Sequence, residues 1–155
     1  MRVTAWRITK RKRIRSAFSG EGASEFGGRW NNAGTAVVYT AQSQSLAALE
    51  MLVHLDSSEL LEKYVLLGAD FDQSLIRSIE PPALPRNWRS DPAPASLRSI
   101  GDDWILAGTS VVLRVPSALV PEENNYLLNP GHRDFARVRV GKPVAFRFDP
   151  RLAMK

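Results

Sequence analysis

A cluster of prolines limits which regular elements this chain can form. Five of the ten prolines lie between positions 81 and 94. Proline fixes φ and has no amide proton, so neither a helix interior nor a central strand can continue through such a segment. We therefore predict an irregular connection at 81–94. Because no repeat or low-complexity linker is present on either side, residues 1–155 are predicted to form a single domain.

The remaining segments predict an α+β fold with more strand than helix. Runs rich in β-branched and apolar residues are typical of strands, whereas longer apolar runs after a capping residue are typical of helices. Strands are predicted at Val3–Ile8, Ala36–Thr40, Tyr64–Phe71, Leu75–Ile79 and Thr109–Val115, with a terminal hairpin of Arg137–Val140 and Val144–Phe148. Helices are predicted at Ser43–Leu55, which should be largely buried, and Ser96–Ala107; loops are predicted at Phe18–Asn32 and Glu122–Asp134.

Composition excludes several classes of protein and site. The hydrophobic fraction of 44% and the charged fraction of 24% are ordinary for a globular protein. Apolar stretches are far shorter than a membrane span, and no signal-peptide pattern is seen, so a cytoplasmic protein is expected. The chain has no cysteine and only two histidines, His54 and His132. A thiolate zinc site and a cysteine nucleophile are therefore excluded, and no metal is expected.

The net charge of +5 is concentrated near the N-terminus. Lys10, Arg11, Lys12, Arg13 and Arg15 lie within six positions. Such a run is typical of a solvated turn after a strand, and it also suits contact with an acidic partner or with phosphates. Both interpretations remain open from the sequence.

Glu50 is the most informative single residue, because it is the only ionisable side chain in the apolar run Leu46–Val53. Helical spacing places it on the face of Leu46 and Val53, where a buried carboxylate costs several kcal/mol unless it is paired or protonated. The position predicts either a structural carboxylate held by an arginine or backbone donors, or a functional group in a cleft.

Three further residues suit a ligand site without requiring one. Arg29 follows a glycine-rich segment whose amides can approach a phosphate closely. The glycine spacing does not match a dinucleotide-binding fingerprint. Tyr39 ends a predicted strand and suits either the core or stacking on a flat ring, and Ser117 follows Pro116 and suits either a turn or a ligand contact.

Taken together, these segments resemble the RES family, which is named for its arginine, glutamate and serine. The resemblance extends over nearly the whole chain. The strings that carry it are Phe18–Ala23, Gly27–Asn31, Val37–Thr40, Leu46–Glu50, Val115–Ala118, Asn125–Pro130 and Phe148–Leu152.

The resemblance implies a compact domain with a mixed β core similar to the ADP-ribosyltransferase fold. It also implies a type II toxin that cleaves the nicotinamide–ribose bond of NAD, with NAD as substrate rather than cofactor. The catalytic positions then fall on Glu50, Tyr39, Arg29 and Ser117, and Arg7 and Asn129 are secondary substrate-binding candidates. Glu25 departs from the family pattern and would weaken phosphate binding nearby.

The expected partner is an Xre-type antitoxin that covers the active site; no nucleic acid or membrane partner is expected, and the oligomeric state is open. Alternatives are ADP-ribosyl transfer to a protein, an RNA-cleaving toxin and a non-catalytic nucleic-acid or protein-binding module. The two histidines are few for RNA cleavage, and no DNA- or RNA-binding signature is present.

Overall fold

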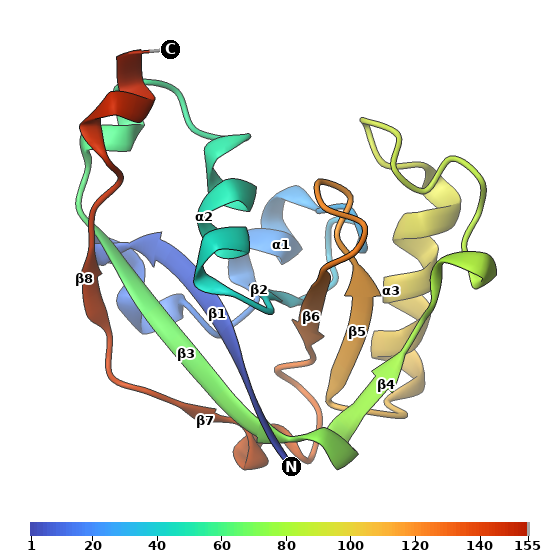
Figure 1. Cartoon of the computed structure of the whole chain (residues 1–155). Coiled ribbons are helices and arrows are strands. Elements are labelled where there is room, and N and C mark those ends of the chain that lie inside the picture. The colour runs from blue at the N-terminus through green and yellow to red at the C-terminus, as the bar shows by residue number, and fades with distance from the viewer. Residues whose placement is uncertain (155) are drawn as a thin grey trace.

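The computed structural model describes residues 1–154, in which eight strands form one mixed sheet (Figure 1). The sheet order is β4–β5–β6–β2–β1–β3–β7, and β8 also pairs with β3. Only β4 and β5 are parallel; the other pairs are antiparallel. The strands are β1 (Arg2–Lys10), β2 (Val38–Ala41), β3 (Tyr64–Asp72), β4 (Ile76–Ser78), β5 (Val112–Pro116), β6 (Asn124–Leu128), β7 (Arg139–Val140) and β8 (Val144–Phe146). The α-helices are α1 (Glu21–Phe26), α2 (Gln44–Leu52) and α3 (Ala95–Ala107).

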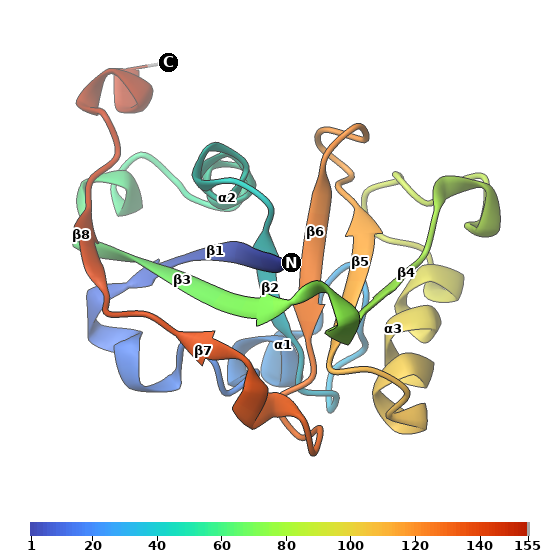
Figure 2. The same ribbon diagram turned by 60° about the horizontal axis from the view of Figure 1, so that its bottom comes forward.

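The sheet is sharply curled between β1 and β2. β1 pairs with β3 along its whole length, but it meets β2 at one position, where Trp6 lies opposite Ala41. Figure 2 shows β1 and β3 running across the direction of β2, β6 and β5. The two halves of the sheet therefore enclose a shared core, to which Ala5 and Phe71 contribute from one half and Val112 and Leu128 from the other.

Two helices cover separate parts of this sheet. Helix α2 packs Leu46 and Ala47 against Ile8 of β1 and its surroundings. Helix α3 packs Leu97 and Trp104 on the apolar cluster of β5 and β6, beneath the proline-rich segment. The helix predicted to follow that segment is confirmed, and so is the predicted α+β fold with a mixed β core. None of the helices in residues 1–154 is long and apolar enough to cross a membrane.

The predicted loop at Glu122–Asp134 is wrong, because it contains β6 in the middle of the sheet. Tyr126 and Leu128 point into the core between the two halves of the sheet, whereas Leu127 points toward α3. A strand that is apolar on both faces shows no alternation of polar and apolar residues. The two asparagines that begin β6 therefore suggested a loop.

The predicted terminal hairpin is also wrong. β7 and β8 do not pair with each other; both pair with β3, Val140 opposite Ala69 and Ala145 opposite Val65. They act as one interrupted edge strand, since three residues separate Val140 from Val144 whereas only two separate their partners Ala69 and Leu66 on β3. Gly141 bridges part of the gap by donating its amide to the Gly68 carbonyl at 2.8 Å.

Three smaller expectations are also corrected. Helix α2 begins as predicted, with Ser43 accepting a hydrogen bond from the Leu46 amide. It is not largely buried, however, because Leu49 is 41% exposed and Val53 is 54% exposed. The predicted glycine-rich loop contains α1, and the segment 81–94 contains one short 3-10 turn, Pro81–Ala83.

Candidate active site

A carboxylate and a buried serine form the centre of the candidate site. Glu50 lies on α2, and Ser117 follows the last residue of β5 and is fully buried. The Ser117 hydroxyl donates to Glu50 Oε1 at 2.8 Å. Its oxygen also accepts from the amides of Leu119 and Val120, each at 3.1 Å. The hydroxyl hydrogen and both lone pairs of the oxygen are thus engaged in hydrogen bonds. Ser117 therefore orients Glu50 and is not placed as a nucleophile.

The second carboxylate oxygen of Glu50 remains available. Oε2 has no hydrogen-bond partner among the side chains and amides of residues 1–154, and the Glu50 side chain is only partly buried. The expected need for a partner is therefore met by Ser117, a neutral donor, rather than by an arginine. A carboxylate fixed through one oxygen can direct the other at a positive charge.

Tyr39 is held beneath the glycine-rich segment. Its hydroxyl donates to Asn31 Oδ1 at 2.5 Å and accepts from the Trp30 amide at 3.0 Å. Burial raises the pKa of Tyr39 far above its ordinary value, so the hydroxyl stays protonated. A Cβ on Gly28 would lie 2.7 Å from the Tyr39 hydroxyl oxygen, which explains a glycine at that position.

Replacing Tyr39 with phenylalanine is expected to destabilise the fold by about 1–3 kcal/mol, because the Trp30 amide and the Asn31 side chain each lose a partner. Urea unfolding followed by tryptophan fluorescence measures the change. Tyr126→Phe is the matched control, since Tyr126 is buried and its hydroxyl makes no hydrogen bond within residues 1–154. Equal stability of both variants would show that the Tyr39 hydroxyl does not fasten this segment.

Arg7 connects the two halves of the sheet next to Tyr39. Its Nη1 donates to the Tyr39 carbonyl at 3.0 Å, at the junction where β1 and β2 share a single paired position. Its Nε is buried and has no hydrogen-bond partner within residues 1–154. Burial lowers the pKa of Arg7, but an arginine remains charged throughout the physiological range.

Arg29 forms hydrogen bonds to the backbone of the proline-rich segment. Its Nη1 donates to the carbonyls of Trp88 at 3.1 Å and Ser90 at 2.8 Å. Between these two residues, the Arg89 side chain donates from Nε to the Ala118 carbonyl at 2.9 Å. Residues 88–90 therefore connect Arg29 to the turn that holds Ser117. No local sequence pattern marks Arg89, which lies in the segment predicted to be an irregular connection.

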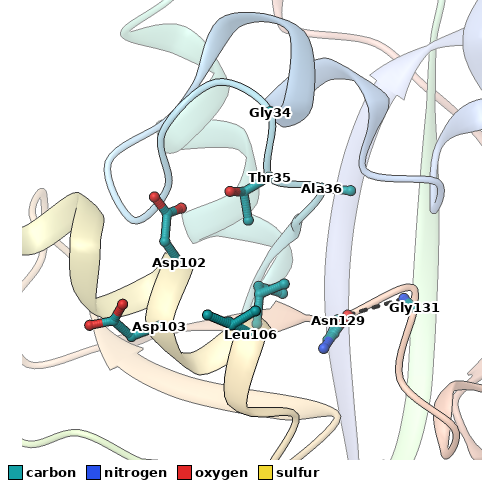
Figure 3. A pocket seen from close by; sticks show the side chains of 9 residues that line it. Gly34, Thr35, Ala36, Asp102, Asp103, Leu106, Asn129 and Gly131 are labelled. Carbon is teal, nitrogen blue, oxygen red and sulfur yellow. Dashed lines mark hydrogen bonds between the residues drawn. The ribbon is translucent and has the colours of Figure 1, made fainter.

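Asn129 lies away from these residues. β6 begins opposite Pro116, beside Ser117, and Asn129 follows its other end. The Asn129 Oδ1 accepts from the Gly131 amide at 3.0 Å, and the residue borders a shallow pocket of about 410 Å³ with Asp102, Asp103 and Leu106 (Figure 3). This pocket thus lies at the far end of β6 from Ser117 and does not include the hydrogen-bonded pair of Glu50 and Ser117.

The histidines and the basic run have other roles. His54 is exposed, and both ring nitrogens of His132 are engaged, Nε2 with the Gly108 carbonyl and Nδ1 with the Asp134 amide, each at 2.9 Å. Lys10 lies 3.2 Å from a Glu59 oxygen and 3.1 Å from a Glu62 oxygen. The other four cations of the run are exposed: Arg11, Lys12, Arg13 and Arg15. Within residues 1–154, no three potential metal ligands lie together.

Comparison with known proteins identifies a family and several similar toxins. The model of the RES domain matches residues 4–149. "Toxin Res" of Yersinia enterocolitica is 46% identical over 148 residues, which cover 95% of this chain and 97% of that protein. The "Prs ADP-ribosylating toxin" of a Sphingobium species is 38% identical over 160 residues, covering 100% and 99%.

A solved structure confirms the predicted fold class. One chain in the crystal structure of the M. tuberculosis MbcT–MbcA toxin–antitoxin complex superposes with a TM-score of 0.78 at 20% identity, covering 99% of this chain and 88% of that one. The family match spans nearly all of the sequence, and the toxins are similar over almost their full length. The chain therefore belongs to the RES domain family, together with these toxins.

Proposed function

We propose that this chain is the toxin of a toxin–antitoxin pair and that it cleaves NAD between nicotinamide and ribose. The observation that carries the proposal is the Glu50 carboxylate, which the buried Ser117 hydroxyl fixes at 2.8 Å and whose second oxygen has no hydrogen-bond partner within residues 1–154. Membership of a family whose relatives are named toxins, one of them an ADP-ribosylating toxin, supports NAD as the substrate.

The proposed reaction needs a negative charge beside the ribose. When the bond to C1′ breaks, its electron pair leaves with nicotinamide, and positive charge develops on the ribose ring. Glu50 Oε2 stabilises that charge, and water or another acceptor then adds at C1′ and loses a proton. Because Ser117 holds Glu50 before the substrate arrives, little reorganisation is needed as the charge forms.

The other site residues bind the substrate in this proposal. Arg29 uses only Nη1 on the proline-rich segment, so its remaining nitrogens can bind a phosphate. The Tyr39 ring provides a flat apolar surface for nicotinamide, since its hydroxyl is already bonded to Asn31. Arg7 supports β2 at this point through the Tyr39 carbonyl.

A second candidate is transfer of ADP-ribose to a protein. It is favoured by the 38% identity to the Prs ADP-ribosylating toxin over the whole chain. Hydrolysis, phosphorolysis and transfer share the bond-breaking step and differ only in the acceptor, so the same Glu50 role serves all three.

Incubating the purified chain with NAD tests the proposal. We expect NAD to fall and nicotinamide to rise in equal amounts, as measured by liquid chromatography. Free ADP-ribose identifies hydrolysis, ADP-ribose 1-phosphate in phosphate buffer identifies phosphorolysis, and label retained on protein from adenine-labelled NAD identifies transfer. Intact NAD, with cleavage or a gel shift of added RNA or DNA, would instead support an RNA-cleaving toxin or a nucleic-acid-binding module.

We further propose that an Xre-type antitoxin covers this site. Apolar side chains flank the pair, since Leu49, next to Glu50, is 41% exposed and Leu119, two residues after Ser117, is 36% exposed. An antitoxin segment that buries them would also exclude NAD. Adding the antitoxin to the assay should stop nicotinamide release, and substituting Leu49 and Leu119 with serine should weaken that inhibition.

A further inference from the structure

The proline-rich segment is attached to the rest of the molecule by three arginine side chains. Arg29 holds the carbonyls of Trp88 and Ser90, and Arg98 of α3 donates to the carbonyl of Ala93. The third is Arg89 itself, whose Nε donates to the Ala118 carbonyl at 2.9 Å. Residues 88–93, which we call the strap, are thus fixed in place although they contain no regular element.

The third attachment places a positive charge next to the candidate active site. Ala118 directly follows Ser117, the residue that holds Glu50. Arg89 uses only Nε on the Ala118 carbonyl, and neither of its Nη atoms has a hydrogen-bond partner within residues 1–154. The guanidinium is therefore anchored on one edge, while its other edge is exposed and unpaired.

An arginine anchored in this way is prepared for an oxyanion. Fixing the guanidinium before binding lowers the side-chain entropy lost when a ligand arrives, and its planar fork matches the oxygens of a phosphate. Arg29 binds the carbonyls of the residues before and after Arg89, so a second guanidinium contacts the same part of the strap. In NAD, the reacting C1′ belongs to the nicotinamide ribose, and this ribose is attached directly to the pyrophosphate.

We propose that Arg89 binds the pyrophosphate of NAD at the phosphate group attached to the reacting ribose. It thereby helps to select a dinucleotide as substrate. This inference rests on the proposed cleavage of NAD at Glu50. It assigns the strap a substrate-binding role beyond that of a connection between β4 and α3.

The test compares Arg89→Ala with Arg86→Ala, an exposed arginine of the same segment that makes no side-chain hydrogen bond within residues 1–154. Loss of a charged hydrogen bond predicts a KM for NAD that rises roughly 5- to 30-fold in Arg89→Ala, with kcat changed less than about twofold. Arg86→Ala should keep the wild-type KM. Arg89→Lys, which retains the charge but not the fork, should restore part of the affinity.

Direct binding separates phosphate contact from a purely structural effect. ADP-ribose is titrated calorimetrically into Glu50→Gln and into Glu50→Gln/Arg89→Ala at low and high salt. We expect weaker binding in the double variant and a smaller dependence on salt, because one ionic contact has been removed. An unchanged KM and ADP-ribose affinity, or an affinity lost equally at all salt concentrations, would overturn the role of Arg89.

The result also distinguishes failure of this inference from failure of the proposed function. If the wild-type chain consumes NAD while Arg89→Ala has the wild-type KM, only the inference about Arg89 falls. If the wild-type chain leaves NAD intact and Glu50→Gln does not bind ADP-ribose, both fall. If NAD stays intact but ADP-ribose binds with the predicted dependence on Arg89, the phosphate site stands and the cleavage does not.

Discussion

Glu50→Gln is expected to slow NAD cleavage by about 10²- to 10³-fold, the loss typical for a single preorganised electrostatic group. The substitution removes the negative charge but keeps an oxygen that can accept the Ser117 hydrogen bond. The fold should therefore remain intact. The loss of activity should appear as a lower kcat rather than a higher KM, because the positive charge on ribose exists only near the transition state. Nicotinamide release under saturating NAD measures the effect.

Glu122→Gln is the matched control. Glu122 is exposed, lies in the same turn region as Ser117, and makes no side-chain hydrogen bond within residues 1–154. It should retain the wild-type rate and so show that a change in net charge alone does not slow the reaction. Nicotinamide release by Glu50→Gln at the rate of Glu122→Gln would remove Glu50 from the mechanism.

Gly101→Ala is expected to destabilise the protein by about 3 kcal/mol or more. Gly101 lies in α3 against the backbone of Trp30, and a Cβ built there would overlap the Trp30 carbonyl oxygen and lie 2.7 Å from its carbonyl carbon. Neither backbone atom can rotate away, so α3 would have to separate from the segment that carries Arg29. Alanine gains about 1 kcal/mol over glycine in a helix interior, which is too little to offset such a clash.

Thermal unfolding should show this loss as a fall in Tm of about 6–12 °C, at 2–4 °C per kcal/mol for a chain of this size. Gly22→Ala is the control, because Gly22 also lies in a helix, α1, and a Cβ there meets no atom within 4 Å. It should be neutral or slightly stabilising. A Gly101→Ala variant as stable as Gly22→Ala would contradict the close packing of α3 on Trp30.

The sequence predicted those elements whose signal is local. β1, β3 and α3 were found from residue type and periodicity, and Ser43 marked the start of α2. β6 was missed because its burial comes from two cores on opposite faces of the sheet. β7 and β8 were assigned to each other because only the curled sheet shows that β3 lies beside both.

The candidate site was predictable in part for a similar reason. A carboxylate within the apolar run of α2 indicated that Glu50 needs a partner, but that partner, Ser117, lies 67 positions away. The family resemblance supplied the pair, and the structure supplied its geometry. No local pattern indicated that Arg29 holds the carbonyls of residues 88 and 90, or that Arg89 reaches Ala118, since these contacts depend on how the proline-rich segment crosses the molecule.

The position of the two longest strands affects how the protein behaves at high concentration. β1 and β3, nine residues each, both lie inside the sheet, and the sheet ends in β4 with three residues and in the interrupted run of β7 and β8. Long unpaired strands are templates for intermolecular pairing and aggregation, whereas short and interrupted edges resist it. Pro143 strengthens this protection by leaving a gap in the outermost row of amide donors. The curled sheet thus keeps the backbone hydrogen-bonding groups of its two longest strands from pairing with other copies of the chain.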